Sequence, residues 1–168
     1  METGRQARGR ILGRAVPWLV LWALLAGPAA AEEFTGRVVG VTDGDTIKVL
    51  HAHQSETVRL LGVDAPEKRQ AYGDRARRFT AELAFDRTVT VRSNGRDRNG
   101  RLLGEVVLPD GRSLSQELVR AGYAWWFRRY SSDIRLARLE EEARQDRRGL
   151  WADAAPTAPW EYRVSGRR

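Results

Sequence analysis

Four acidic residues lie close together in the sequence, namely Asp43, Asp45, Asp64 and Glu67. Carboxylate oxygens are hard donors, so Asp45 and Asp64 suit calcium or magnesium better than a soft metal. Carboxylates gathered at one point repel each other unless a cation lies among them. For Asp43 the alternative is a plain turn residue, because Asp before Gly is common in Asx turns. The group as a whole predicts a site for a hard divalent cation.

Two arginines could face this acidic group. Arg59 lies among apolar residues in TVRLLGV, and Arg101 follows a turn in DRNGRLLG. A strand arginine can simply point to solvent, but a guanidinium held by a barrel wall can also bind a phosphate through two parallel hydrogen bonds. Guanidinium groups and a cation stabilise the charge that develops during phosphodiester hydrolysis, and a carboxylate can activate or orient the attacking water. The combination predicts phosphodiester hydrolysis.

Short strands must position these residues. Five segments are rich in β-branched residues or alternate as strands do: 34–42, 45–50, 57–62, 88–92 and 102–108. Asp43-Gly44 predicts a hairpin turn between the first two. Because the helical patterns come mostly after these strands, we expect an α+β, mainly β fold. It would be a five-stranded Greek-key barrel of the OB-fold type with about three packed α-helices.

Three segments have helical patterns. The first helix is expected over residues 71–85. The second should begin after Ser113, with Gln116 closing a capping box, and the third after Ser132 or Asp133.

The end of the chain has no comparable pattern. Gly149 is expected to stop the third helix. Residues 152–168 contain two prolines and little periodicity, so we expect a C-terminal tail after a domain at 32–151.

The first 31 residues have the three parts of a secretory signal peptide. An arginine-rich head precedes an apolar run at 15–25, and Ala29 to Ala31 supply small residues for cleavage. An uncleaved anchor is the alternative, but about 12 apolar residues are too few for the roughly 20 that cross a bilayer. We therefore expect a secreted or periplasmic protein with no stable membrane insertion after cleavage of residues 1–31.

The composition points to an anionic partner. The 168 residues carry a formal net charge of +7. Because residues 1–31 contain four arginines and one acid, the remaining chain has 25 basic and 21 acidic residues and stays cationic. Such an excess favours nucleic acid as a partner. The absence of cysteine from the sequence excludes disulfides, thiolate metal sites and cysteine nucleophiles.

Four sequence blocks, in this order, carry a family resemblance: VTDGDTIKV, VRLLGVDAPE, DRNGRLLG and LVRAGYAWW. Together they resemble the calcium-dependent staphylococcal nuclease (thermonuclease) family over roughly residues 34–151. The resemblance implies an OB barrel with three helices that binds one calcium ion. It also implies cleavage of DNA and RNA with little sequence specificity, leaving 3′-phosphates.

The resemblance assigns roles around the ion. Asp45 and Asp64 match the family's calcium ligands, and Ala65 falls where the backbone carbonyl binds the same ion. Asp43 matches a nearby acid that does not bind the ion itself but supports the residues that do.

The resemblance also assigns the catalytic groups. Glu67 matches the carboxylate that activates or orients water. Arg59 and Arg101 match the two phosphate-contacting arginines. The reaction residues are thus expected to be these three.

Further arginines and aromatic residues are candidates for substrate binding. Tyr130 resembles a nucleotide-contacting tyrosine of the family, and Arg128 precedes it in the aromatic and basic segment WWFRRY. Arg98, in the turn before Arg101, is the third expected substrate contact.

Another class of protein could share this composition. A non-catalytic OB-fold protein that binds single-stranded nucleic acid is the alternative, and an inert scaffold is a third. A binder has no use for the acidic group, because carboxylates repel phosphate. We therefore expect a monomeric nuclease that acts on DNA and/or RNA.

Overall fold

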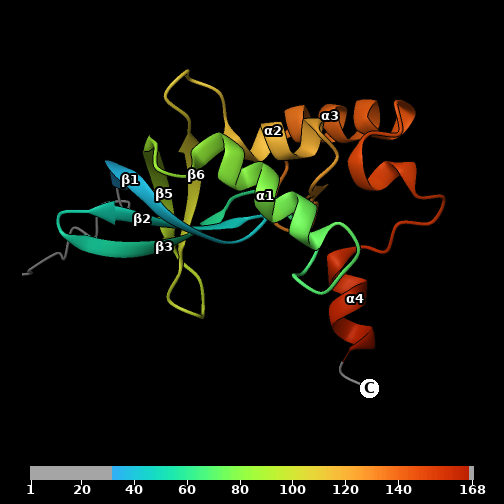
Figure 1. Ribbon diagram of the computed structural model, residues 1–168, viewed down its shortest axis with the longest axis horizontal. Coiled ribbons are helices and arrows are strands. Elements are labelled where there is room, and N and C mark those ends of the chain that lie inside the picture. Colours follow the sequence, from blue (N-terminus) through green and yellow to red (C-terminus); the bar gives the residue numbers. More distant parts are fainter. Residues whose placement is uncertain (1–31, 167–168) are drawn as a thin grey trace, which may run out of the picture. The chain divides into compact units, whose positions relative to one another are not determined.

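The computed structural model describes residues 32–166, so the expected signal peptide at 1–31 lies outside the described residues. Five strands form a closed barrel in the order β1-β2-β3-β6-β5 (Figure 1). Their bounds are β1 Glu32–Asp43, β2 Thr46–His51, β3 Gln54–Leu60, β5 Thr88–Arg96 and β6 Leu102–Val107. Neighbours are antiparallel except for the parallel pair of β3 and β6. This is the expected mainly β, OB-type barrel.

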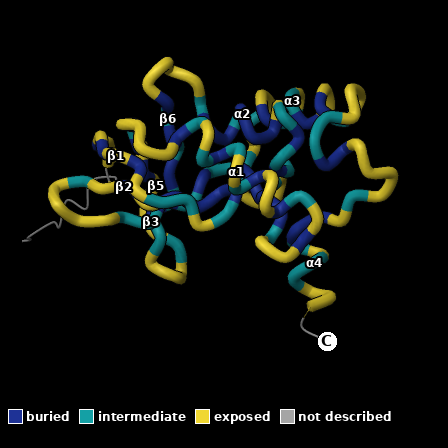
Figure 2. The backbone as a smooth tube through the Cα atoms, in the orientation of Figure 1, coloured by how far each residue is buried: buried dark blue, intermediate teal, exposed yellow. Residues whose placement is uncertain are grey.

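Strand β1 closes the barrel because it pairs with both β2 and β5. Its register against β2 shifts between Val38 and Gly40 and again between Val41 and Asp43. Such irregularities bend a strand and increase its twist, which lets one long strand serve two neighbours. Alternate side chains of the barrel strands point inward, so Ile47, Val58 and other β-branched residues fill the core. Figure 2 shows the buried backbone running through the strands and into α1 and α2.

The helices lie outside the barrel. The α-helices are α1 Gly73–Ala84, α2 Leu114–Arg120, α3 Ile134–Gln145 and α4 Pro159–Ser165, with a 3-10 helix at Gly149–Ala152. Helix α1 packs against β1 and α2, and α2 packs against α3. A separate two-stranded ribbon joins β4, Val63–Asp64, to β7, Trp125–Trp126. None of the helices within residues 32–166 is long and apolar enough to cross a membrane.

The helix ends differ in part from expectation. Asp133 does cap α3, since its side chain accepts a hydrogen bond from the Arg135 N–H. Ser113 is the N-cap of α2, but its side chain makes no cap hydrogen bond, so the expected capping box is wrong. The expected stop at Gly149 is also wrong. Helix α3 ends at Gln145, and Arg147 already takes a left-handed conformation with a φ of 52°.

Helix α4 was not expected, since its segment shows little periodicity. Pro159 occupies the first helical position, where its fixed φ suits a helix and its missing N–H costs nothing. The seven residues lie within what was predicted to be an irregular tail. The helix bears directly on the site described next.

Candidate active site

The turn between β1 and β2 carries the first two acids. Asp43 ends β1, and Asp45 lies in the turn with only 2% of its surface exposed. The Asp43 carboxylate accepts the Asp45 N–H at 3.3 Å, and the Asp45 carbonyl accepts the N–H of Leu60 at 2.9 Å. Burial raises the pKa of Asp43 above its ordinary value. The turn therefore presents a buried carboxylate toward β3.

Strand β3 places Arg59 next to this carboxylate. Arg59 lies directly across from Thr46 of β2, so its side chain extends beside Asp45. One guanidinium nitrogen, Nη2, is 2.8 Å from Oδ1 of Asp64, and the other contacts the Asp45 carboxylate. Burial lowers the pKa of Arg59 and the charge of Asp64 opposes that shift. Since an arginine stays protonated in either case, a single guanidinium bridges two carboxylates.

The ribbon of β4 and β7 places Asp64. The backbone of Asp64 pairs with Trp125, and that of Val63 pairs with Trp126. Phe127 extends the link by donating its N–H to the Gly62 carbonyl at 2.9 Å. The tandem tryptophans thus hold the segment that carries Asp64 through their backbone, a role that the sequence did not indicate.

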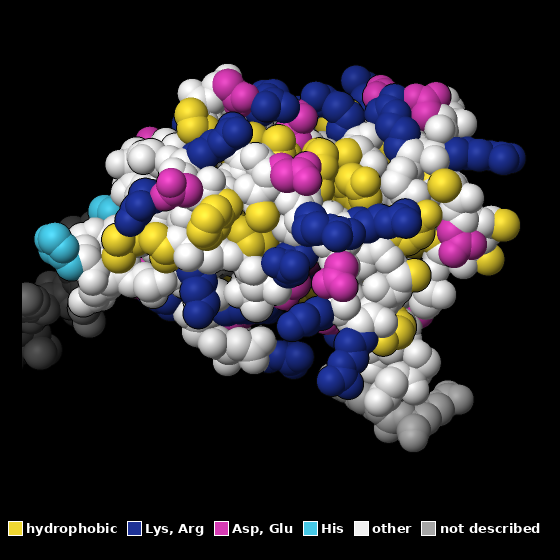
Figure 3. Space-filling model, in the orientation of Figure 1, with side chains coloured by type: hydrophobic (Ala, Val, Ile, Leu, Met, Phe, Trp, Pro, Cys, Tyr) yellow, Lys and Arg dark blue, Asp and Glu magenta, His cyan; other side chains and the backbone are white. Residues whose placement is uncertain are grey.

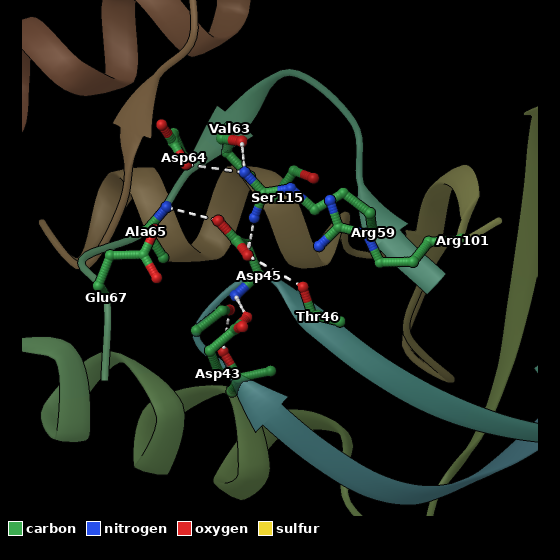
Figure 4. Close-up of polar contacts among 12 residues, drawn as sticks. Asp43, Asp45, Thr46, Arg59, Val63, Asp64, Ala65, Glu67, Arg101 and Ser115 are labelled. Atoms are coloured by element: carbon green, nitrogen blue, oxygen red, sulfur yellow. Dashed lines mark hydrogen bonds and ion pairs between the residues drawn. The ribbon is translucent and has the colours of Figure 1, made fainter. Parts of the chain in front are cut away.

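Ala65 completes the acidic pocket from the other side. Its N–H donates to Oδ2 of Asp45 at 2.6 Å, and the Thr46 hydroxyl donates to Oδ1 of the same carboxylate at 3.2 Å. Asp45 is thereby fixed by the backbone of one neighbour and the side chain of another (Figure 4). The expected role of the Ala65 carbonyl stays a prediction.

Glu67 follows this segment and is more open than the two aspartates. Its side chain is 38% exposed, whereas that of Asp64 is 1% exposed. The backbone N–H of Glu67 donates to Oε1 of Gln70 at 3.1 Å, which fixes the chain at this point. One Glu67 oxygen contacts Arg163 of α4. A partly exposed carboxylate beside a buried acidic pocket can reach solvent water.

Arg101 enters the site from the same side as Arg59. In Figure 4 the side chains of both arginines run toward Asp45, and Glu67 lies on the opposite side, beyond Ala65. Arg101 is held by Asp97, whose Oδ2 lies 2.8 Å from Nε and 2.7 Å from Nη2. Sequence reasoning missed Asp97, although its position four residues before Arg101 in the same turn was a signal.

The predicted substrate residues occupy two places. Arg128 and Tyr130 line a pocket of about 500 Å³ together with Trp126, Phe127 and Trp160. Arg98 is exposed on the turn between β5 and β6. The structure therefore brings Arg128 and Tyr130 together on one aromatic surface, and Arg98 lies on a separate loop.

Arg128 itself is held by two neighbours. Its guanidinium pairs with the buried Glu140 at 3.1 Å and lies 5.2 Å from the ring centre of Trp126. Its side chain is still 69% exposed, so it remains accessible from solvent.

The donor set of the pocket suits a hard cation. Asp45 and Asp64 are buried, and both reach the same guanidinium, so their oxygens converge on one point. Within residues 32–166, no group of three or more acids or histidines is close enough to hold a metal by side chains alone. Two carboxylates would therefore need backbone carbonyl or water ligands as well, which calcium accepts readily. On that chemistry the residues fit calcium.

Charged side chains are numerous on the face of the molecule drawn in Figure 3. Figure 3 shows Lys and Arg side chains spread over the visible face, with Asp and Glu among them. Most of the recorded ion pairs on the surface are of short sequence range or largely exposed, for example Arg135 with Asp133. Such pairs contribute little stability, so the arginines remain available to attract a polyanion.

The fold and the site together define a class of protein. An OB-type barrel here gathers two buried carboxylates, a partly exposed carboxylate and two arginines, which are groups that can stabilise the charge developing during phosphodiester hydrolysis. The family model described as staphylococcal nuclease homologue matches residues 57–153. This chain belongs to that family and is a phosphodiester-hydrolysing endonuclease that acts on nucleic acid.

Individual relatives agree with this membership. A protein of Escherichia coli O157:H7 named as an uncharacterised endonuclease is 46% identical over 145 residues, which cover 86% of this chain and 94% of that protein. A micrococcal nuclease of Shigella flexneri is 40% identical over 150 residues, covering 83% of this chain and 86% of its own. Protein ParB of Escherichia coli is 43% identical, with coverage of 83% and 84%. The first two names favour an enzyme over the binding protein considered as the alternative.

Proposed function

We propose that this protein is a calcium-dependent endonuclease that cuts DNA and/or RNA with little sequence specificity and leaves 3′-phosphates. The observation that carries the proposal is the bridge from Arg59 to both Asp45 and Asp64, with Glu67 on the far side of Ala65. Arg59 and Arg101 thus lie on one side of the acidic pocket, and Glu67, the carboxylate that would activate water, lies on the other. The resemblance to the calcium-dependent nucleases supports the choice of ion and product.

The ion would be held by Asp45, Asp64 and the backbone carbonyl of Ala65. The Asp43 carboxylate would support Asp45 by accepting the Asp45 N–H. When bound, a calcium ion supplies positive charge that polarises a phosphate oxygen. It would also compete with Arg59 for the two carboxylates. Arg59 would then be free to turn its planar fork toward the phosphate.

Glu67 is the group that handles water. Its partly exposed carboxylate can accept a proton from a water molecule as the water oxygen attacks phosphorus. The bond from phosphorus to the 5′-oxygen then breaks, the leaving oxygen takes up a proton, and the phosphate stays on the 3′ side. Arg59 and Arg101 bind the phosphate oxygens on which negative charge increases, and this favours the transition state over the ground state.

The aromatic surface accounts for the low specificity. Tyr130 is 68% exposed, and its ring packs edge-on against Phe127. Every base has a π-face, so stacking on such a surface tolerates any sequence. Arg128 adds a charge for the backbone, and Arg98 would contact the strand from the turn between β5 and β6.

We further propose that the enzyme is secreted or periplasmic, after removal of residues 1–31, and that it works as a monomer. The basis for secretion is the order of the arginine-rich head, the apolar run and the alanines in the sequence. Mass spectrometry of the protein recovered from the expressing bacterium should show a mature chain that begins near residue 32. An intact N-terminus in a membrane fraction would contradict this proposal.

The function is tested by digestion of supercoiled plasmid and of single-stranded RNA with purified protein. We expect cleavage with calcium and its loss in excess EGTA. The product ends should become ligatable only after the 3′-phosphate is removed and the 5′-hydroxyl is phosphorylated. Glu67→Gln should lower kcat by about 10³-fold or more, with an unchanged thermal unfolding curve. The exposed Glu82→Gln on α1 serves as the matched control and should cut at the native rate. Full activity of the Glu67 variant, or cleavage in EGTA, would overturn the proposal.

A further inference from the structure

The C-terminal segment is attached to the active site at several points. Nε2 of Gln70 donates to the carbonyl of Thr157 at 2.7 Å. Three residues later, the ring of Trp160 stacks on Phe127 with a centroid distance of 5.5 Å and an interplanar angle of 5°. In Figure 1 the start of α4 lies beside the loop that leads into α1, which is the loop that carries Glu67. Helix α4 is therefore docked next to the catalytic loop.

Helix α4 directs one arginine to the acids of the site. Arg163 binds Asp64 through both nitrogens, with Nη2 at 2.7 Å from Oδ2 and Nη1 at 3.2 Å from Oδ1. The same Nη1 lies 2.7 Å from Oε1 of Glu67. One guanidinium thus joins the buried carboxylate to the partly exposed one. These partners are 96 and 99 residues away in the sequence.

Among the contacts of residues 32–166, only the bond from Arg163 engages the side-chain carboxylate of Glu67. The Gln70 amide fixes the backbone of Glu67, but a glutamate has three side-chain torsions that remain free. The bond from Arg163 engages one carboxylate oxygen, so the orientation of the other, Oε2, becomes defined. A positive charge between Asp64 and Glu67 also removes the repulsion that would drive the two carboxylates apart.

Arg163 is well suited to that task. The side chain is 37% exposed, and the stacked rings of Trp160 and Phe127 hold the preceding turn of α4. A rigid fork on a docked helix loses little entropy when it binds a carboxylate.

We propose that Arg163 is a positioning residue of this nuclease: from α4 it orients the carboxylate of Glu67 toward the attacking water. The inference rests on the proposed function, because it requires Glu67 to act on water. It makes the C-terminal helix part of the active site and not an appended tail. A cation at Asp64 would compete for the contacts of Arg163 with that residue, whereas the bond to Glu67 uses a separate carboxylate.

The test compares Arg163→Ala, Arg163→Lys and Glu67→Gln in the full-length protein at saturating calcium. We expect Arg163→Ala to lower kcat by about 10–100-fold with little change in KM, because the group acts through Glu67 and not on the substrate. Arg163→Lys should lie between the alanine variant and the native enzyme, since an ammonium can reach one carboxylate but cannot bridge both. Millimolar methylguanidinium should restore part of the rate of Arg163→Ala.

Controls separate positioning from a structural role. Arg138→Ala removes an exposed arginine of α3 for which no ion pair is recorded within residues 32–166, and it should keep the native rate without any response to methylguanidinium. Hydrogen exchange of the α4 amides reports whether the helix stays docked in each variant. If α4 undocks in Arg163→Ala, the rate of Arg163→Lys decides whether Arg163 positions Glu67, because this variant keeps the charge.

Calcium binding, followed by titration calorimetry, gives a second measurement. Loss of a positive charge beside Asp64 should leave the calcium affinity of Arg163→Ala unchanged or tighter. Three outcomes for Arg163→Ala would each overturn the inference. These are a native kcat, a loss of rate that is explained by weaker calcium binding, and a gain of rate caused by removing a competitor for the cation. An inactive Glu67→Gln beside a fully active Arg163→Ala rejects only the positioning role, whereas an active Glu67→Gln rejects the proposed function itself.

Discussion

The hydroxyl of Thr80 donates a hydrogen bond of 2.6 Å to the carbonyl of Gly44, which lies 36 residues earlier in the chain. Thr80 is fully buried on α1, and Gly44 is the residue between Asp43 and Asp45 in the hairpin turn. A helix on the outside of the barrel therefore fixes the turn that carries two acids of the site. Because the bond is buried, leaving the Gly44 carbonyl without its donor would lower the free energy of unfolding.

Thr80→Val should destabilise the protein by about 1–3 kcal/mol, since it keeps the shape of the side chain but removes the donor to Gly44. The loosened turn should also weaken calcium binding at Asp45. Thr80→Ser keeps the hydroxyl and should lose less stability and less calcium affinity than Thr80→Val. Urea denaturation and calorimetric calcium titration measure the two effects, and equal values for the valine and serine variants would contradict the role of the bond.

Gly44→Ala should be damaging for a steric reason. A Cβ at this position would lie 2.7 Å from the Cβ of Ala65 and 2.8 Å from the Cβ of Ala76, closer than such atoms approach. We expect a loss of about 1–3 kcal/mol, as for other overpacked sites, and a lower nuclease rate because the turn and Ala65 must separate. Gly40→Ala is the control, since its added Cβ meets ordinary contacts at 3.5 Å. Equal unfolding midpoints for the two variants would rule out this explanation.

Arg59→Lys should lose nearly as much activity as Arg59→Ala. A lysine keeps the charge but cannot bridge Asp45 and Asp64 or bind a phosphate with a planar fork. Steady-state kinetics on plasmid DNA measure the loss, which we expect to fall mainly on kcat. A lysine variant that cuts at a near-native rate would show that the fork is not needed.

Asp97 should make stability depend on pH at the acidic end. Burial alone would raise the pKa of Asp97. Hydrogen bonds from the side chain and N–H of Arg101 and from the N–H of Asn99 outweigh burial and hold the pKa below its ordinary value. A lowered folded-state pKa means that the stabilisation is complete above the ordinary pKa and is lost as pH falls through the folded value.

The corresponding variant is Asp97→Asn. It should be less stable than the native protein at neutral pH, and the difference should shrink as pH falls below about 4. Urea denaturation at a series of pH values measures this difference, with the exposed Glu82→Gln as the control. A difference that stays constant down to pH 2 would contradict the ion pair with Arg101 as its cause.

Glu140 should support the site from a distance. It is 2% exposed, accepts the N–H of Trp126 at 3.0 Å and pairs with Arg128 and Arg144. Glu140→Ala should cost about 1–3 kcal/mol of unfolding free energy, because it leaves the partly buried N–H of Trp126 without its acceptor and removes the partner of two partly exposed arginines. Glu140→Gln keeps an acceptor for Trp126 and should cost less. Thermal unfolding separates the two, and the alanine variant should also cut more slowly, since β7 pairs with the strand that carries Asp64.

The barrel and much of the site follow from local sequence. The Asp43-Gly44 dipeptide marks the hairpin, and the alternating segments mark the five strands, because turn conformation and strand alternation depend on neighbouring residues. Arg59 lies opposite Thr46 once these two strands pair, so its approach to Asp45 is a consequence of the register. The blocks that resemble the nuclease family cover these same residues.

Tertiary structure alone decided which distant segments complete the site. The tryptophans of β7 hold Asp64 through backbone pairing, which no side-chain pattern encodes. Helix α4 is only seven residues long, so its sequence has too few turns to show a period. The contact of Arg163 with Glu67 spans 96 residues. Such contacts depend on how the helices pack over the barrel, and this packing is settled by the whole core and not by any one segment.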